Sequence, residues 1–246
     1  SKTLLQAAKT YHHTLHGEIF GVEADGVRFN LGKAHAHKNR VMDRMRDGIA
    51  GLMKKHKVEV VFGRATLSAG PAVTVDGETH EADNVLICTG SSPAKPPIPG
   101  IDADHVVDSS GILELPELPE RLVIVGGGVI GCEFACVFGS VGVPVTVIEA
   151  LPEICPGVDP EVASVLRKEL EKKNITFRLG AKVDEIGDKE VKFTLDGETQ
   201  SVPGDVVLVA TGRKPNVSGL GLEDLRVDVD ERGGIRVNDR GATNVP

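Results

Sequence analysis

The sequence predicts an α/β fold in which two regions follow one plan, and three observations support this. The stretch LVIVGGGVIGCEFA, residues 122–135, passes from an apolar strand through a glycine turn into a helix. Two other segments, VTVDGETHEADNVLICTGSSP and FTLDGETQSVPGDVVLVATGRKP, share a D-G-E-T turn, an apolar strand and a closing T-G step. Short β-branched runs alternate with amphipathic stretches, which is typical of mixed α/β proteins.

Composition and charge narrow the class of protein. The chain has 246 residues, of which 40% are hydrophobic and 26% charged, and its formal net charge is -8. This balance disfavours nucleic acid or an anionic membrane as a main partner, since both require clustered positive charge. No apolar run reaches the roughly 18 residues of a membrane helix. The first residues lack a secretory core, so we expect a cytoplasmic protein.

The first half of the chain predicts two helices followed by strands. Residues 1–16 and 35–56 carry apolar residues at helical spacing. The first helix has Leu4, Leu5, Ala8 and Leu15 at helical spacing, and the second has Val41, Met45, Ile49, Leu52 and Met53 on one side. We expect a strand in residues 58–67, a hairpin with its turn at Asp76-Gly77, and a buried strand in residues 85–88. Proline-rich connectors cover residues 93–100 and 115–121.

The second half predicts a βαβ unit. The order of strand, glycine loop, helix and strand fills residues 122–149. A helix should begin near Asp159, with Asp159 as its cap and Pro160 in its first turn. A strand region at 175–186 and a second hairpin follow, leading to a strand that ends at Thr211-Gly212.

The internal similarity predicts that the chain is a piece of a longer one. The glycine loop starts 85 residues before Thr211, and the same offset from Thr89 lands at residue 4, where there is no glycine loop. Because repeats of one plan should each carry such a loop, we expect the first loop to lie upstream of Ser1.

The glycine loop predicts a phosphate site. Gly126 would permit the tight turn, Gly128 would let the backbone approach a pyrophosphate, and Gly131 would let the helix pack on the strand. The helix N-terminus offers free N–H groups and partial positive charge. The alternative is a plain glycine turn, but the strand, loop, helix and a following acidic residue occur in the expected order.

That acidic residue is Glu149, which lies 18 positions after Gly131. A carboxylate at this point can accept the ribose hydroxyls of an adenosine and would repel a 2′-phosphate. No Arg or Lys occurs between Glu149 and Arg167 to hold such a phosphate. We therefore predict NAD rather than NADP, the alternative being a solvated surface glutamate.

Cysteines and histidines favour structural roles. Cys132 and Cys136 are four residues apart on a predicted helix, where small apolar packing is expected rather than a redox pair. His12 and His16 should share a helix face, and His35 and His37 a strand-like side. Solvated or pairing histidines are expected there rather than a metal site.

Three segments, GGGVIGCE, VTVIEALPEICPGVD and LVATGRKPN, resemble the pyridine nucleotide–disulfide oxidoreductase family, most closely its dihydrolipoamide dehydrogenase branch. The resemblance covers essentially the whole chain. It implies the two-dinucleotide-binding flavoprotein fold, with a Rossmann-like NAD-binding domain and part of an FAD-binding domain. The implied ranges are 1–115 for the partial FAD-binding domain, 116–237 for the NAD-binding domain and 238–246 for a return segment to the FAD-binding domain.

The resemblance also implies site residues. Those for FAD are Lys2 near the reactive edge of the flavin, Ala65 by its adenosine part, and Thr89, Gly90 and Ser91 along its nucleotide. Those for NAD are Gly126, Gly127, Gly128, Val129, Ile130 and Gly131 at the pyrophosphate, Glu133 and Gly212 toward the nicotinamide, Glu149 at the ribose and Val183 by the adenine. An exposed terminal lysine and ordinary strand-end turns are the alternatives for Lys2, Thr89–Ser91 and Gly212.

The family implies an electron relay from a dithiol, dihydrolipoamide, through a disulfide and FAD to NAD. The redox cysteine pair and the histidine base of the family have no counterpart in the chain. We therefore expect no catalytic residue within it and a fragment inactive by itself. The resemblance further implies a homodimer and, as partners, a 2-oxoacid dehydrogenase or glycine cleavage complex.

Two other hypotheses stay open from the sequence. The first is a sibling flavoprotein such as a transhydrogenase, a mercuric reductase or an NADH oxidase. The second is a non-catalytic NAD-binding module, for instance a sensor, which predicts a stable, flavin-free protein.

Overall fold

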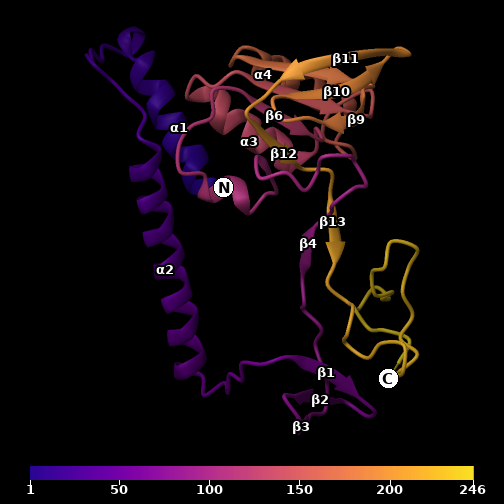
Figure 1. Cartoon of the computed structure of the whole chain (residues 1–246). Coiled ribbons are helices and arrows are strands. Elements are labelled where there is room, and N and C mark those ends of the chain that lie inside the picture. Colours follow the sequence, from indigo (N-terminus) through magenta and orange to yellow (C-terminus); the bar gives the residue numbers. More distant parts are fainter. Residues whose placement is uncertain (246) are drawn as a thin grey trace. The chain divides into compact units, whose positions relative to one another are not determined.

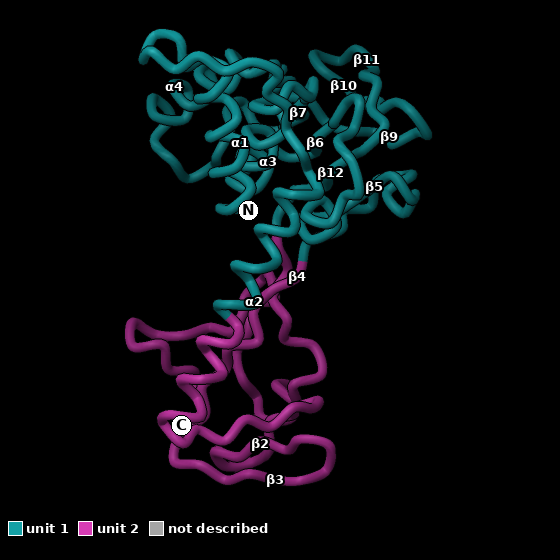
Figure 2. The backbone as a smooth tube through the Cα atoms, turned by 90° about the vertical axis from the view of Figure 1, so that its left-hand side faces the viewer, with its two compact units in different colours: residues 1–45, 93–212 teal, residues 46–92, 213–246 magenta. Residues whose placement is uncertain are grey.

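The computed structural model describes residues 1–245. The chain forms two compact units, shown in different colours in Figure 2: unit 1 comprises residues 1–45 and 93–212, and unit 2 comprises residues 46–92 and the chain from Arg213 onward. The predicted domain boundaries at 115/116 and 237/238 do not coincide with the limits of these units.

A five-stranded parallel sheet forms the centre of unit 1, with the strand order β5-β12-β6-β7-β8. Two of its strands, β6 and β12, are labelled in Figure 1. Its strands are β5 (Val106–Val107), β6 (Leu122–Val125), β7 (Val145–Glu149), β8 (Ile175–Leu179) and β12 (Val206–Val209). All four residues of β6 are buried. Such continuous apolar strands are typical of a parallel sheet that is covered on both faces.

The two faces of this sheet have different covers. Leu122 and Ile124 pack in a cluster with residues of the helices α1 (Lys2–Leu15), α3 (Val129–Ser140) and α4 (Pro160–Glu171). Val123 and Val125 point the other way, as alternation along a strand requires, and pack with residues of a second, antiparallel sheet. That sheet comprises β9 (Lys182–Ile186), β10 (Glu190–Leu195) and β11 (Glu198–Pro203).

Local signals define the ends of these elements. The Asp159 carboxylate accepts hydrogen bonds from the backbone N–H groups of Glu161 and Val162, so it caps α4 as predicted. Asp196 and Gly197 join β10 to β11 with φ angles of 52° and 82°, which a two-residue hairpin turn requires.

The first predicted helix is confirmed as α1, in which Leu4 and Ala8 are buried. The second is α2 (Leu31–Lys55), which begins four residues before the predicted start at residue 35. Its N-terminal part belongs to unit 1, where the buried ammonium of Lys38 donates to the Leu113 carbonyl at 2.7 Å and contacts the Glu114 carboxylate at 2.5 Å. Short 3-10 helices, η1 (Glu18–Phe20) and η2 (Gly111–Glu114), complete this unit.

Unit 2 contains an antiparallel meander of β1 (Ala65–Ser68), β2 (Ala72–Val75) and β3 (Glu78–Glu81). The predicted hairpin is confirmed, since Asp76 and Gly77 have φ angles of 48° and 93°. A two-stranded sheet of β4 (Ser91–Pro93) and β13 (Arg213–Pro215) is also formed.

One predicted strand is found only in part, and another predicted strand and one predicted apolar face are not found. Of the strand predicted over 58–67, only residues 65–67 form a strand, as part of β1, and residues 85–88 form none. Leu86 is 87% exposed, whereas Leu208, at the matching position of the second copy, is fully buried in β12. The reason is that β12 has β5 and β6 as neighbours, while the described part of unit 2 forms no parallel sheet that residues 85–88 could join. Likewise, Met45, Ile49 and Leu52 of α2 are 51–64% exposed rather than packed.

The histidine predictions are confirmed in part. His12 and His16 share a face of α1 and stack with ring centroids 4.3 Å apart. His35 and His37 lie in α2, so the predicted strand-like side is wrong, because residues two apart on a helix face different directions. Among residues 1–245, no cluster of three or more His, Cys, Asp or Glu side chains could hold a metal ion. In the same range, no helix is long and apolar enough to cross a membrane.

Candidate functional site

The glycine loop lies between β6 and α3 in unit 1, and its conformation depends on glycine at two positions. Gly126 has a φ of +107°, and a Cβ there would lie 2.6 Å from the carbonyl oxygen of Ala210. A Cβ on Gly131 would lie 2.1 Å from the carbonyl oxygen of Gly126. The tight turn and the close approach of helix to strand therefore require residues without a side chain.

Gly128 differs from Gly126 and Gly131 because the space that a side chain would occupy is open. A Cβ on Gly128 would meet no protein atom within 4 Å, and the residue lines an open cleft. Gly128 is also the N-terminal cap of α3 and offers no side chain for capping. The first N–H groups of α3 therefore have no side-chain cap and carry the partial positive charge of a helix start, next to the cleft.

The cleft next to this loop has a volume of about 710 Å³, which is within the usual range of ligand sites. Five residues predicted for NAD line it: Gly126, Gly128, Glu149, Val183 and Gly212. The other five predicted residues do not line it: Gly127, Val129, Ile130, Gly131 and Glu133. Gly127 and Gly131 are buried behind the loop surface instead.

Part of the cleft wall was not predicted from the sequence. Pro96, Pro97 and Ile98 line the cleft, although the sequence indicated only a stiff connector there. Lys182 and Asp184 of β9 also line it. Lys182 places a cation in the cleft wall. The search for Arg or Lys directly after Glu149 did not reveal it, because Lys182 lies further along the chain and comes close to the cleft only in the folded structure.

Glu149 ends β7 and is only 8% exposed. One carboxylate oxygen accepts the backbone N–H of Gly127 at 2.6 Å, and the other accepts that of Leu151 at 2.8 Å. The side chain thus holds the glycine loop in place while it lines the cleft. Each carboxylate oxygen has further lone pairs, so these two bonds leave the carboxylate able to accept further hydrogen bonds.

Lys2 and Glu133, predicted for the flavin and for the nicotinamide end respectively, form an ion pair with each other. The lysine side chain is 82% exposed and that of the glutamate 23%. The hydrogen bond from the Lys2 ammonium lowers the pKa of Glu133, against the opposing effect of partial burial. This contact joins residues 131 positions apart, and no pattern in the sequence indicated it.

The remaining residues predicted for FAD lie in unit 2, whereas Lys2 lies in unit 1. The Thr89 carbonyl accepts a hydrogen bond from the Asn216 side chain at 3.1 Å, and the Gly90 carbonyl accepts the Asn216 backbone N–H at 3.0 Å. The Ser91 hydroxyl accepts one from Arg213 at 2.7 Å. These bonds fix the turn at residues 89–91, whereas Ala65 begins β1.

The second T-G step borders the cleft in unit 1. Gly212 has a φ of +132°, and its carbonyl accepts the backbone N–H of Ala94 at 2.9 Å. The backbone N–H of Ala210 donates to the Val125 carbonyl at 2.8 Å. The T-G step is thereby joined to the end of β6, which leads into the glycine loop.

The chain is similar to known proteins along its whole length. Relatives include the dihydrolipoyl dehydrogenases of Thermus scotoductus, 39% identical, and of Acholeplasma laidlawii, 37% identical. Each match covers the whole chain, but only 54% and 74% of the relative. The HOCl-induced flavoprotein disulfide reductase RclA of Escherichia coli matches 99% of the chain and 53% of its own length, with a TM-score of 0.79 and 29% identity.

The chain thus spans about half the length of most of these relatives. It matches the description of one family, pyridine nucleotide-disulphide oxidoreductase, over residues 1–246. The predicted resemblance and the α/β flavoprotein fold are confirmed. On these grounds the chain belongs to the pyridine nucleotide-disulphide oxidoreductase family.

Proposed function

We propose that the chain carries the NAD site and part of the FAD site of a flavoenzyme. In this proposal the enzyme passes electrons from a dithiol, dihydrolipoamide, through a disulfide and FAD to NAD. The observation that carries the proposal is the cleft of unit 1, in which the open glycine Gly128 and the buried carboxylate of Glu149 face the same space. The greater similarity to dihydrolipoyl dehydrogenases than to RclA supports the substrate.

The fit to NAD rests on complementary chemistry. The pyrophosphate would lie against Gly128 at the start of α3, since no Cβ fills that space. Glu149 would accept the ribose hydroxyls and repel a 2′-phosphate, and Val183 would lie by the adenine. Gly212 and Glu133 would lie toward the nicotinamide. When bound, the nicotinamide ring exchanges a hydride with the flavin.

The flavin part of the proposal concerns Lys2, Ala65, Thr89, Gly90 and Ser91. The hydrogen-bonded turn at residues 89–91 would line the flavin nucleotide, and the proposed domain arrangement is 1–115, 116–237 and 238–246. A homodimer, and docking to a 2-oxoacid dehydrogenase or glycine cleavage complex, belong to the same proposal. Reduction of NAD by dihydrolipoamide, assayed on the complete enzyme, tests the substrate.

Ligand titration tests the NAD site directly. NADH should bind more tightly than NADPH, and Glu149→Ala should weaken NADH binding. Glu198→Ala, an exposed position on β11, provides a matched control that should bind as the original does. Lys182→Ala should leave the preference for NADH intact if Glu149 sets it. Unchanged NADH affinity in a folded Glu149→Ala protein would refute the assignment.

A further inference from the structure

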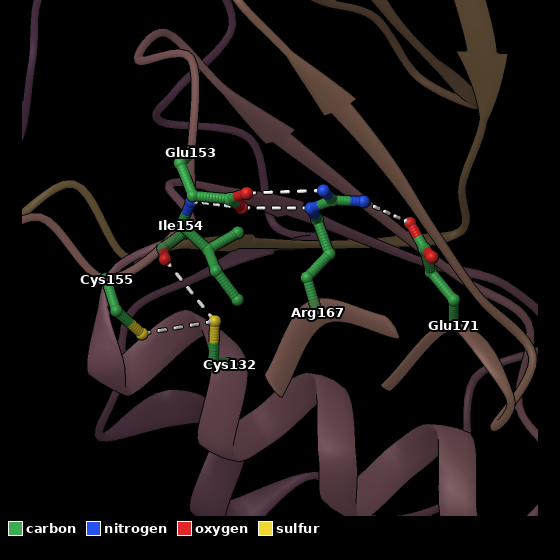
Figure 3. Close-up of polar contacts among 7 residues, drawn as sticks. Cys132, Glu153, Ile154, Cys155, Arg167 and Glu171 are labelled. Atoms are coloured by element: carbon green, nitrogen blue, oxygen red, sulfur yellow. Dashed lines mark hydrogen bonds and ion pairs between the residues drawn. The ribbon is translucent and has the colours of Figure 1, made fainter. Parts of the chain in front are cut away.

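Two thiols meet directly beneath the glycine loop. Cys132 lies in the first turn of α3, and Cys155 lies in the segment between β7 and α4. Their side chains are buried, and the two Sγ atoms are 3.8 Å apart. Figure 3 shows the sulfur atoms pointing toward each other. Both cysteines are in the free thiol form.

The carbonyl oxygen of Gly127 links this thiol pair to the loop. It accepts a hydrogen bond from the Cys132 thiol at 3.3 Å and another from the Cys155 backbone N–H at 2.9 Å. The N–H of the same glycine donates to Glu149. The N–H and the carbonyl of Gly127 are therefore held by Glu149 and by the two cysteines.

The segment that carries Cys155 is held against the rest of unit 1. Arg167 of α4 contacts both carboxylate oxygens of Glu153, at 2.9 and 3.2 Å, and also bonds Glu171 at 2.9 Å. Figure 3 shows this row of charged side chains beside the two sulfurs. Cys155 itself has a φ of +52°, an uncommon conformation for a residue with a side chain. The two sulfurs are thus kept together by fixed neighbours.

We propose that Cys132 and Cys155 form an oxidisable thiol pair whose disulfide weakens NAD binding. A peroxide is the oxidant: one thiolate attacks hydrogen peroxide and becomes a sulfenic acid with release of water, and the second thiol displaces the hydroxyl as a second water. In balance, two thiols and one peroxide give one disulfide and two waters. The effect on NAD rests on the proposed function, whereas formation of the disulfide does not.

The geometry gives the direction of the effect. The sulfurs must approach from 3.8 Å to about 2.05 Å, so the side chains on either side of Gly127 must move. The Gly127 carbonyl also loses its thiol donor. The Gly127 N–H is held by the Glu149 carboxylate at 2.6 Å, so a shift of the loop also disturbs this hydrogen bond. We expect the dissociation constant for NADH to rise about fivefold or more, as for one lost hydrogen bond.

Burial sets the rate of the reaction. Desolvation, with the neighbouring Cys155 as a second cause, raises the pKa of Cys132, so its thiolate is scarce at neutral pH. Oxidation should therefore be slower than that of the exposed Cys88. Cys136, on the same helix as Cys132, provides a matched control for the thiol pair. Its sulfur lies 4.0 Å from the Ser140 hydroxyl and not beside a second thiol.

The test uses the purified protein with Cys88→Ser, to prevent links between molecules, treated with hydrogen peroxide. Digestion after glutamate places the three thiols of unit 1 in separate peptides, since Glu133, Glu149 and Glu153 lie between them. We expect a linked peptide pair containing Cys132 and Cys155, and weaker NADH binding that a dithiol reductant reverses. Cys136→Ser should behave in the same way, and Cys155→Ser should show neither change.

Each result decides one part of the proposal. If peroxide yields no Cys132–Cys155 link, the thiol pair is refuted. If the link forms and the NADH affinity is unchanged, the effect on NAD binding is refuted. If the reduced protein does not bind NADH at all, the proposed function fails, while the peptide map still decides whether the disulfide forms. Because peptide mapping uses the protein with both thiols intact, a misfolded serine variant does not affect this test.

Discussion

A methyl group added at Gly131 should disturb both the stability and the NADH affinity of the protein. In Gly131→Ala the new Cβ would lie 2.1 Å from the Gly126 carbonyl oxygen, and 3.3 Å from Ile124. Since Cβ contacts shorter than 3.0 Å are essentially not found, the backbone must move by about 0.9 Å. The obstacle is main chain and not the end of a flexible side chain, so the loop itself has to shift.

The magnitude follows from two opposing effects. Overpacking of this kind costs about 1–3 kcal/mol, and replacing a helical glycine by alanine recovers about 1 kcal/mol. We expect the free energy of unfolding to fall by about 1–2 kcal/mol, because the displaced group is backbone. NADH binding should weaken as well, since the carbonyl that moves belongs to the glycine loop of the proposed NAD site.

Two matched substitutions separate packing from binding. Gly128→Ala meets no protein atom within 4 Å, so unfolding should change by less than about 0.5 kcal/mol while NADH binding is lost. Gly48→Ala lies inside α2 with open space around it and should stabilise the protein by about 0.5–1 kcal/mol.

Urea unfolding followed by circular dichroism gives the stabilities, and the fluorescence of NADH gives the affinities, since the chain has no tryptophan. A Gly131→Ala protein as stable as the original would refute the packing argument. Undiminished NADH binding by Gly128→Ala would refute the placement of the pyrophosphate.

Three further substitutions test other parts of the structure. Glu149→Gln leaves one of two backbone N–H groups without an acceptor, so urea unfolding should show a loss of about 1–3 kcal/mol; an unchanged midpoint would contradict the bracing role. Arg167→Gln should cost about 0.5–1 kcal/mol at neutral pH. The hydrogen bond from Arg167 lowers the pKa of Glu153. The stability that this ion pair contributes is therefore present above the ordinary glutamate pKa and is lost as the pH falls through the lowered pKa of Glu153. A cost of Arg167→Gln that does not depend on pH in urea titrations would argue against this ion pair. Leu208→Ala in buried β12 should cost about 2–5 kcal/mol, whereas Leu86→Ser should change unfolding of the 246-residue chain by less than about 0.5 kcal/mol; equal losses would show that residues 85–88 are packed after all.

The elements predicted correctly are those whose signals are local. The βαβ unit follows from an apolar run, a glycine turn and a helix, and the Asp159 cap and the Asp76-Gly77 hairpin follow from adjacent residues. In each case the backbone conformation is decided within a few positions. Hence these predictions needed no knowledge of the neighbouring elements.

The predictions that failed depend on distant partners. Residues 85–88 have the apolar pattern of a buried strand, but a strand requires neighbours, and only the second copy has them in β5 and β6. The same reasoning applies to the exposed face of α2. The Lys2–Glu133 pair and the cleft wall at Pro96–Ile98 also join segments far apart in sequence. No spacing rule could have indicated them.

The glycine loop shows how local and distant determinants combine at one site. Its motif specifies a turn that only glycine can make, and this could be predicted from spacing. The position of that turn depends on Gly127, whose N–H is held by Glu149 and whose carbonyl is held by Cys132 and Cys155. These partners come from the end of β7, from α3 and from the segment before α4. Loss of the Glu149 carboxylate or oxidation of the two thiols should therefore affect the proposed NAD binding, even where the glycines themselves are unchanged.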